Sequence, residues 1–181
     1  STVMASELHV DAIKHSGGTS AITINSSGLV LPKLPILQVS ATNTDQSVSG
    51  GTDTKVEWET VEIDSLSGWS TSNHRYTPTV AGYYLVGGTL RANLSSIVTY
   101  VSLAISKNGF DTNDGTDMLR GQFNYQSDTI SNGSYPLPTG LIEMNGSSDY
   151  IEIYFKTDEA STLHDSTAPK SFFFAQLVHA T

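Results

Sequence analysis

The residues most suggestive of chemistry in this chain are three neighbours, His164-Asp165-Ser166, which carry the side-chain types of a hydrolase triad. A working triad brings together groups from distant parts of a chain, and three consecutive residues in a polar loop cannot take that geometry. The sequence also has no Gly-x-Ser-x-Gly turn to present a nucleophile and no phosphate-binding loop. These residues therefore do not predict a hydrolase.

Metal binding is the second chemistry to weigh, and the ligands for it are sparse. The chain has no cysteine, and its five histidines never fall at a zinc-ligand spacing. Those histidines are His9, His15, His74, His164 and His179. A looser calcium site could use the acidic loop residues Asp111, Asn113, Asp114 and Asp117. The loop departs from the helical-hand template because Gln122 replaces the closing Glu, so a solvated hairpin loop is favoured and no cofactor is expected.

Paired carboxylates are the third possibility for chemistry. Glu57 and Glu59 share one face of a predicted strand, since residues two apart point the same way. Nothing marks a cleft around them, so we interpret them as a solvated acidic stripe, with Trp58 on the opposite face in the core. Trp69 lies in a predicted loop, where it either stacks on a carbohydrate or packs locally. We therefore expect a binding protein and not an enzyme.

Composition limits the partners of this protein. The 181 residues carry a formal charge of −9, and the nine Lys and Arg residues are scattered singly, which disfavours nucleic acid. An acidic surface also disfavours anionic membranes, and no apolar run approaches the length needed to span one. The start of the chain, 1–11, lacks the charged and apolar regions of a signal peptide. Without disulfides, a core or an oligomer interface must supply the stability.

The chain divides into two regions of different composition. Residues 1–33 form a lead of low hydrophobicity with short alternating stretches, too few and too short to bury a core. We expect the lead to dock on the main domain, on a sister chain or on another protein, in preference to a flexible tail. Pro32 and Pro35 bracket a linker, and residues 34–181 form the main domain.

Short strand-like stretches follow one another closely after the linker, separated by turn signals such as Asn108-Gly109, Asn132-Gly133 and Asn145-Gly146. The predicted strands are Ile36–Ala41, Lys55–Ile63, Arg75–Thr77, Tyr83–Leu94, Thr99–Lys107, Met118–Tyr125, Ser134–Met144, Tyr150–Lys156 and Ser171–His179. Strands at this spacing predict an all-β, antiparallel two-sheet jelly-roll sandwich with a short extended N-terminal segment.

The last predicted strand is apolar on both faces. Phe173, Ala175 and Leu177 alternate with a second apolar set, which consists of Phe172, Phe174 and Val178 and is interrupted by Gln176. In a two-layer sandwich the outer face normally meets water, so a strand of this kind is covered on both sides. Either a loop of the same chain or a subunit interface could provide the cover.

The segment 75–86 resembles the signature of the complement globular-head domain, a member of the tumour-necrosis-factor-like jelly rolls. Tyr76 stands at the position of the first aromatic residue, and Gly82 with Tyr84 supplies the Gly-x-Tyr that opens a long strand. The segment 141–153 is similar to the turn of Leu, Gly and Asp that precedes the penultimate strand of that family.

The end of the chain resembles the final Ser-x-Phe-x-Gly-x-Leu strand of the same family. Residues 171–177 match it with Phe173 and Leu177, while Ala175 replaces the usual Gly. The resemblance implies a ten-stranded jelly roll, packed as a homotrimer, with exposed loops used for recognition. It suggests a signature core and a trimer interface. The core would consist of Tyr76, Gly82, Phe173 and Leu177, and the interface of Tyr83, Tyr84, Phe172, Phe174 and Val178.

The lead carries a second resemblance. Residues 6–24 look like the opening of tail-fibre and structural proteins of tailed bacteriophages, where it attaches a variable distal domain to the particle. This resemblance implies contacts with other virion proteins. The virion-attachment residues would be Leu8, Val10, Ile13, Ile22 and Ile24.

Together the two resemblances predict a virion structural protein on the tail or particle surface. It would be a trimeric fibre or spike whose head binds a glycan or protein of the host cell surface. The alternatives are a capsid decoration, head-fibre or collar protein, and a non-viral lectin-like recognition module. A glycan depolymerase is a further class, but it needs a carboxylate pair in a groove, and the sequence does not assign one.

Overall fold

A computed structural model describes the following parts of the chain: 12–14, 16–18, 20–24, 26–28, 30–32, 34–41, 45–111, 118–163 and 171–181. Within these ranges all regular structure is β-strand, which confirms the all-β prediction. The described residues contain no helix that could cross a membrane. The chain forms two compact units, Ser1–Leu34 and Pro35–Thr181.

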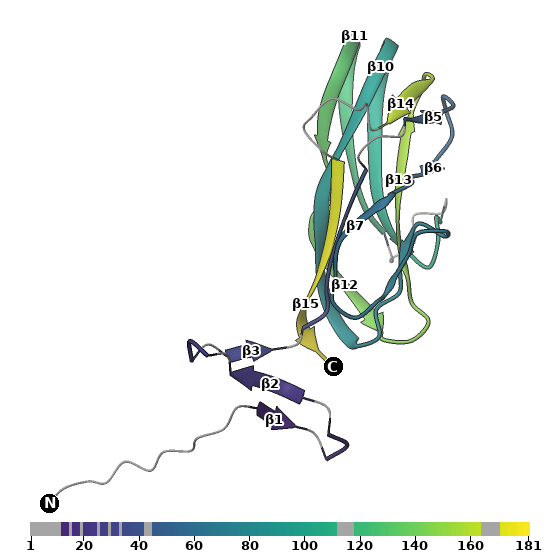
Figure 1. Cartoon of the computed structure of the whole chain (residues 1–181). Helices are drawn as coiled ribbons and strands as arrows, with labels where there is room; N and C mark the ends of the chain where they lie inside the picture. The colour runs from purple at the N-terminus through teal and green to yellow at the C-terminus, as the bar shows by residue number, and fades with distance from the viewer. Residues whose placement is uncertain are drawn as a thin grey trace, which may run out of the picture. The chain divides into compact units, whose positions relative to one another are not determined.

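The N-terminal unit is a small antiparallel sheet in the order β1-β2-β3 (Figure 1). Its strands are β1 (Ala12–Lys14), β2 (Ser20–Ile24) and β3 (Val30–Pro32). Exposed turns at 16–18 and 26–28 join them. Ile13 lies opposite Ile22 in the register of the first pair. Because side chains alternate along a strand, Ile24 shares the face of Ile22.

The second unit, which we call the head, contains the remaining strands of the described chain. They are β4 (Ile36–Ala41), β5 (Gln46–Val48), β6 (Thr54–Lys55), β7 (Thr60–Asp64), β8 (Trp69–Ser70), β9 (Arg75–Tyr76), β10 (Ala81–Lys107), β11 (Met118–Pro136), β12 (Gly140–Asn145), β13 (Ile151–Thr157), β14 (Ser161–Leu163) and β15 (Ser171–Ala180).

The long strand β10 belongs to both layers of the head. Its first part pairs with β15 and β12, and β15 pairs in turn with β4 and β4 with β7. We call this set layer A. The second part of β10 pairs with β13 and with the first part of β11, and β13 also pairs with β6 and β9. We call this set layer B. Two antiparallel layers joined in this way form the predicted jelly-roll sandwich.

The hydrophobic core lies between the two layers. Alternate residues of β15, including Phe173 and Leu177, face alternate residues of β13, including Ile153 and Phe155, in one cluster of buried side chains. Trp58 is completely buried in the same cluster, as predicted. Each such side chain contributes about 1.5–3 kcal/mol through burial.

Two predicted strand breaks are wrong. The stretch between Leu94 and Thr99 does not end a strand, because β10 continues through it with shifts of register. The expected turn at Asn132-Gly133 lies inside β11, where Gly133 pairs with Ala92. The chain instead leaves the ladder after Pro136. Proline has no N–H to donate, which suits the end of a strand pairing better than its middle.

The predicted strand Lys55–Ile63 corresponds to parts of two strands in the structure. It begins with the last residue of β6, continues through residues 56–59, which are not in a strand, and ends within β7. The first pairs with β13 in layer B and the second with β4 in layer A, so the chain changes layers between them. Val56 and Trp58 are buried in this crossing, whereas Glu57 and Glu59 are exposed. This alternation of buried and exposed residues is the sequence pattern of a half-buried strand, which is why a strand was predicted there.

Candidate functional site

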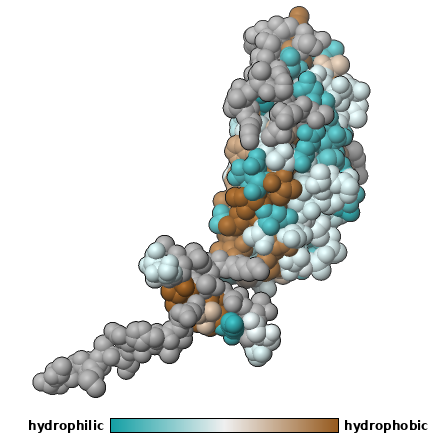
Figure 2. Space-filling view, in the orientation of Figure 1, coloured by the Kyte–Doolittle hydropathy of each residue, from teal (hydrophilic) through white to brown (hydrophobic). Residues whose placement is uncertain are grey.

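The outer face of layer A is largely apolar, and five strands contribute to it. We call it the apolar outer face; it consists of Ile36, Ile63, Tyr83, Leu85, Leu141, Phe172, Phe174 and Val178. Leu141 is 56% exposed and Val178 is 51% exposed, which leaves these side chains in water in a single chain. Figure 2 shows hydrophobic residues gathered over the region where β15 runs in Figure 1. An exposed apolar surface of this kind marks an interaction site.

The register of the strands brings apolar groups of neighbouring strands together on this face. Phe174 lies opposite Gly87 on one side and Gln38 on the other. A methyl group at Gly87 would come within 3.1 Å of the Phe174 ring, so the ring covers the bare backbone there. Leu85 lies opposite Leu141 on the next strand. Aromatic and aliphatic groups therefore meet across β15, β10 and β12, and two polar side chains share the face, Gln176 opposite Leu85 and Glu143 opposite Tyr83.

The structure places four of the five predicted interface residues on this face. Tyr83 is 37% exposed, Phe172 and Phe174 are half-buried, and Val178 is exposed. Their part in a trimer stays a prediction. Tyr84 is wrong as an interface residue, because its side chain is completely buried in the core of the single chain. Consecutive strand residues point to opposite faces, so Tyr83 and Tyr84 cannot share one.

The residues of the family-like signature form a local core. Tyr76 is 1% exposed and packs edge-on against Tyr84, with ring centroids 6.1 Å apart. The hydroxyl of Tyr84 donates a hydrogen bond of 2.8 Å to the carbonyl oxygen of Val80, which ties the loop before β10 to the strand. Burial raises the pKa of Tyr84 to about 12. Phe173 and Leu177 are buried in the same core.

Gly82 is required by the close approach of two strands. Its φ of 147° lies in a region that L side chains rarely adopt, and a Cβ there would collide with the carbonyl oxygen of His179. The glycine of the Gly-x-Tyr pattern therefore lets the end of β15 lie directly against the start of β10.

A pocket of about 290 Å³ adjoins the apolar outer face. Tyr83 and Leu141 belong to both, and Leu119, Lys107 and Glu143 are among the other lining residues. The volume is at the lower limit for a small-molecule site. Polar groups, including the Lys107 amine and the Glu143 carboxylate, line the pocket together with aliphatic side chains, so it suits a side chain from another protein surface that carries a polar group.

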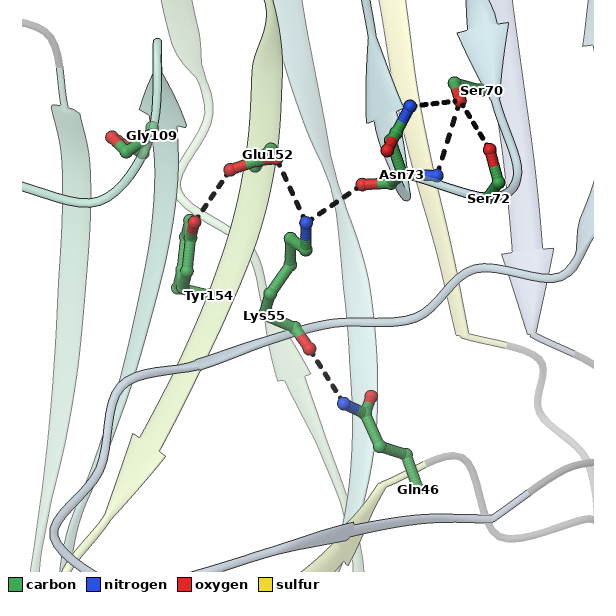
Figure 3. Close-up of polar contacts among 9 residues, drawn as sticks. Gln46, Lys55, Ser70, Ser72, Asn73, Gly109, Glu152 and Tyr154 are labelled. Atoms are coloured by element: carbon green, nitrogen blue, oxygen red, sulfur yellow. Dashed lines mark hydrogen bonds and ion pairs between the residues drawn. The ribbon is translucent and has the colours of Figure 1, made fainter.

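The outer face of layer B is polar, in contrast to layer A. Glu152 is 5% exposed and accepts hydrogen bonds from Tyr154, at 2.7 Å, and from the amine of Lys55, at 3.2 Å (Figure 3). The same amine also donates to the carbonyl oxygen of Asn73, at 3.0 Å. Burial and the nearby Glu152 carboxylate raise the pKa of Tyr154.

A second group of charges lies on this polar face. Asp53 accepts from Lys156 at 2.9 Å and from Arg120 at 3.4 Å. Arg120 also donates to the hydroxyl of Ser102, which is 2% exposed. Long charged side chains thus cover the small residues of β10 and exchange hydrogen bonds with one another. This arrangement stabilises a solvent-facing surface and brings no reactive pair together.

Asp149 holds two turns at one end of the sandwich. Its carboxylate accepts from the side chains of Asn108, at 2.9 Å, and Lys107, at 3.1 Å, and from the backbone N–H of Asn145, at 2.9 Å. Burial alone would raise the pKa of Asp149, but these hydrogen bonds outweigh it and lower the pKa. The sequence contained this Asp in a family-like turn, but its role in joining the 107–109 and 145–149 turns appears only in three dimensions.

The remaining chemical candidates from the sequence are not brought together. Glu57 and Glu59 are exposed, and Trp69 is half-buried against the core on the short strand β8, which corrects its assignment to a loop. His74 contacts the carbonyl oxygen of Trp58 at 3.3 Å. Among the described residues, no group of three or more acidic, His or Cys side chains could hold a metal ion.

Several candidates lie outside the described residues. They are His9, His15, Asn113, Asp114, Asp117, and the run of His164, Asp165 and Ser166, together with Leu8 and Val10. Of the predicted attachment residues, Ile13 is 50% exposed, and Ile22 and Ile24 are half-buried on the N-terminal sheet. Their role in attachment stays a prediction.

Comparison with known proteins finds similarity in structure alone. No family model matches the sequence, and no curated protein matches it. The Eiger TNF of S. frugiperda has a TM-score of 0.57 and 16% identity, covering 82% of this chain and 95% of that one. Murine APRIL at pH 8.5 has a TM-score of 0.56 and 14% identity, covering 81% and 100%. The globular domain of zebrafish complement 1qA has a TM-score of 0.52 and 12% identity, covering 81% and 99%.

These likenesses agree with the resemblance to complement globular heads and tumour-necrosis-factor-like jelly rolls, and they bring no support for the resemblance to bacteriophage fibres. At this level of identity they establish the fold of the chain. The protein therefore has the jelly-roll fold shared by the Eiger TNF, APRIL and the globular domain of complement 1qA.

Proposed function

We propose that this protein is a recognition module that works as a homotrimer. In this proposal, two sister chains cover the apolar outer face of each head, and the exposed loops bind a glycan or protein partner. The single observation that carries the proposal is the largely apolar outer face on layer A, with Leu141 and Val178 more than half exposed.

The geometry of the face suits a cyclic assembly. In a closed trimer each subunit contributes two different patches, because the interface is heterologous. The apolar outer face offers an aliphatic region on β7 and β4, with Ile63 and Ile36, and a region on β10 and β12 that adjoins the pocket. Side chains from the first region of one chain could fill the second region of the next.

A role in binding is supported by how the polar groups of the head are used. The charged side chains of layer B bond to one another, and Asp149 joins two turns. These contacts are structural, because each carboxylate is held by donors of its own surface. The absence of an enzymatic role remains part of the proposal.

A narrower form of the proposal is that the head belongs to a bacteriophage fibre, spike, decoration or collar and lies on the virion. It is carried only by the resemblance of residues 6–24 to fibre openings. The structural likenesses favour the broader form, a recognition module that need not be viral. Antibody labelling of particles, if the chain comes from a phage, would test the narrower form.

The proposed trimer is tested by native mass in solution. Light scattering should give a mass close to three times the 19.4 kDa of one chain. Phe174→Asp should reduce the mass to that of one chain, because an unpaired charge buried in an interface costs several kcal/mol. Gln122→Asp is the matched control, since Gln122 is exposed on the polar face of layer B and its variant should stay trimeric. A monomeric unmodified chain, or a trimeric Phe174→Asp variant, would contradict the proposal.

A further inference from the structure

The two turns that Asp149 joins each contain an asparagine followed by a glycine. Asn108-Gly109 follows β10, and Asn145-Gly146 begins at the last residue of β12. An asparagine in this position can lose its side-chain nitrogen without an enzyme, because glycine has no side chain to hinder attack by its own backbone nitrogen. Both asparagines are exposed to water, which the reaction consumes. The two turns therefore offer the same chemistry in different surroundings.

The reaction, deamidation, exchanges the side-chain amide of Asn108 for an acid. The backbone nitrogen of Gly109 loses its proton and forms a bond with Cγ of Asn108. The bond from Cγ to the side-chain nitrogen breaks, and this nitrogen leaves as ammonia together with the proton. Water then opens the resulting cyclic imide at either carbonyl carbon and leaves aspartate or isoaspartate. Because water is the only other reactant, the surroundings of each turn decide how fast the reaction proceeds.

The side chain of Asn145 is held firmly within its own turn. Its Oδ1 atom accepts hydrogen bonds of 2.9–3.0 Å from three backbone N–H groups, which belong to Ser147, Ser148 and Asp149. Its Nδ2 atom donates to the hydroxyl of Ser148 at 2.9 Å. The backbone of Gly146 is also tightly packed, since a Cβ there would lie 2.6 Å from the carbonyl carbon of Val80. Attack on Cγ of Asn145 would therefore break four hydrogen bonds and shift a backbone that has little space to move.

The side chain of Asn108 is held by fewer contacts. Its Oδ1 atom accepts from the backbone N–H of Tyr150, at 3.0 Å, and its Nδ2 atom donates to Oδ1 of Asp149, at 2.9 Å. Gly109 is packed less tightly than Gly146, because a Cβ on Gly109 would meet the Tyr150 hydroxyl at 3.4 Å, an ordinary contact distance. The side chain of Asn108 can therefore turn toward the Gly109 nitrogen at the cost of these two hydrogen bonds.

We propose that Asn108 is a deamidation site of the folded protein, and that its conversion to aspartate loosens the two turns that Asp149 joins. The amide of Asn108 donates to the Asp149 carboxylate, whereas the carboxylate that replaces it can only accept. Two like charges would then face each other where a hydrogen bond stood, with the amine of Lys107 at 3.1 Å from Asp149 left to serve both. This inference does not depend on the proposed trimer.

Peptide mapping of the full chain by mass spectrometry tests the site, because it measures conversion at each asparagine during storage in a mildly alkaline buffer. The same measurement in urea gives the rates of the unfolded chain, where only neighbouring residues matter. We expect similar rates at Asn108 and Asn145 in urea. In the folded chain, Asn145 should be slowed relative to urea roughly tenfold more than Asn108, since it must break more hydrogen bonds. Equal slowing at both positions, or no conversion of Asn108 in the folded chain while the unfolded chain reacts, would overturn the site.

Asn108→Asp tests the consequence directly, since it installs the product. We expect a lower melting temperature than for the unmodified chain, whereas Gln122→Asp, which adds the same charge at an exposed position of layer B, should melt close to it. Combining Asn108→Asp with Asp149→Asn exchanges the amide and the carboxylate, so the double variant should melt above the value expected from adding the two single losses. An Asn108→Asp variant that melts with the unmodified chain, or single losses that simply add, would contradict the proposed repulsion.

Discussion

The two outer faces of the head are built from the same kind of strands and differ in what they present to water. On layer A, the rings of Phe172 and Phe174 share the outer face with exposed aliphatic groups such as Leu141. On layer B, Glu152 and Asp53 are each held by cations or hydroxyls. One long strand, β10, runs through both layers.

This difference indicates which face the protein leaves in water. Charged side chains on layer B satisfy one another at little cost in free energy, and their aliphatic stems cover the small residues beneath. The apolar outer face of layer A has no such arrangement and would expose a large apolar surface in an isolated chain. The same alternation that builds the core therefore distinguishes a solvated face from a face that is to be covered.

The largest effect should come from the core side of layer A. Phe173→Ala removes a ring that is completely buried, and we expect a loss of about 3–5 kcal/mol in the free energy of unfolding. Chemical denaturation measures it. The neighbouring variant Phe174→Ala, on the outer face, should instead weaken assembly and leave the fold of each head in place. Equal effects of the two variants on unfolding at low protein concentration would contradict the division into inner and outer faces.

Leu141→Ala should weaken association of the chains, whereas truncation of an equally exposed residue outside the apolar outer face should not. In a single chain Leu141 is 56% exposed, so its truncation alone should cost little, but in the proposed trimer it should weaken association by about 1–3 kcal/mol. Ile97 is an equally exposed aliphatic residue, at 57%, outside the apolar outer face. Sedimentation at several concentrations should show earlier dissociation for Leu141→Ala, and Ile97→Ala should behave like the unmodified chain.

A fall in pH should weaken the contacts of the Asp149 carboxylate and should leave the apolar outer face unchanged, because that face does not depend on a titrating group. The pKa of Asp149 is lowered in the folded state, so its stabilisation is complete above the ordinary value of 3.8 and is lost as the pH falls through the lowered pKa. Asp149→Asn removes the carboxylate that Lys107 contacts and should cost about 1–3 kcal/mol at neutral pH. Thermal melts between pH 7 and pH 2 should show a shallower acid dependence for this variant. An identical dependence in both proteins would mean that Asp149 does not join the turns as described.

The smallest effect should be at the surface charges of layer B. Asp53→Asn weakens the contacts with Lys156 and Arg120, all of which are partly exposed, so the loss should stay below about 1 kcal/mol and shrink in high salt. The native mass should not change. A loss of trimer from this variant would mean that layer B takes part in the interface and would overturn the comparison between the two faces.

Much of the head could be predicted from local patterns. The Asn108-Gly109 turn has positive φ at both residues, and the alternation of β15 correctly separates Phe173 from its neighbours. The same signals failed at Asn132-Gly133, because a long partner strand was available to continue the ladder. Pairing with a distant strand outweighs the preference of a two-residue turn, and the sequence around Gly133 does not contain that information.

The candidate site was predicted in part. The doubly apolar last strand indicated an interface, but Tyr84 was assigned to the wrong face, since its position in a signature does not show which way it points. The pocket beside Tyr83 and Leu141 could not be foreseen, because its walls come from strands far apart in the sequence.

The sequence by itself determined the all-β class, several turns and the two-faced last strand, because these follow from side-chain alternation and from residues that tolerate positive φ. Only the tertiary structure decided that layer A and not layer B carries an apolar outer face. It also decided that β10 serves both layers and that Asp149 joins two turns. The physical reason is that each of these features depends on pairing between strands remote in sequence, and such pairing is selected by the burial of the whole core.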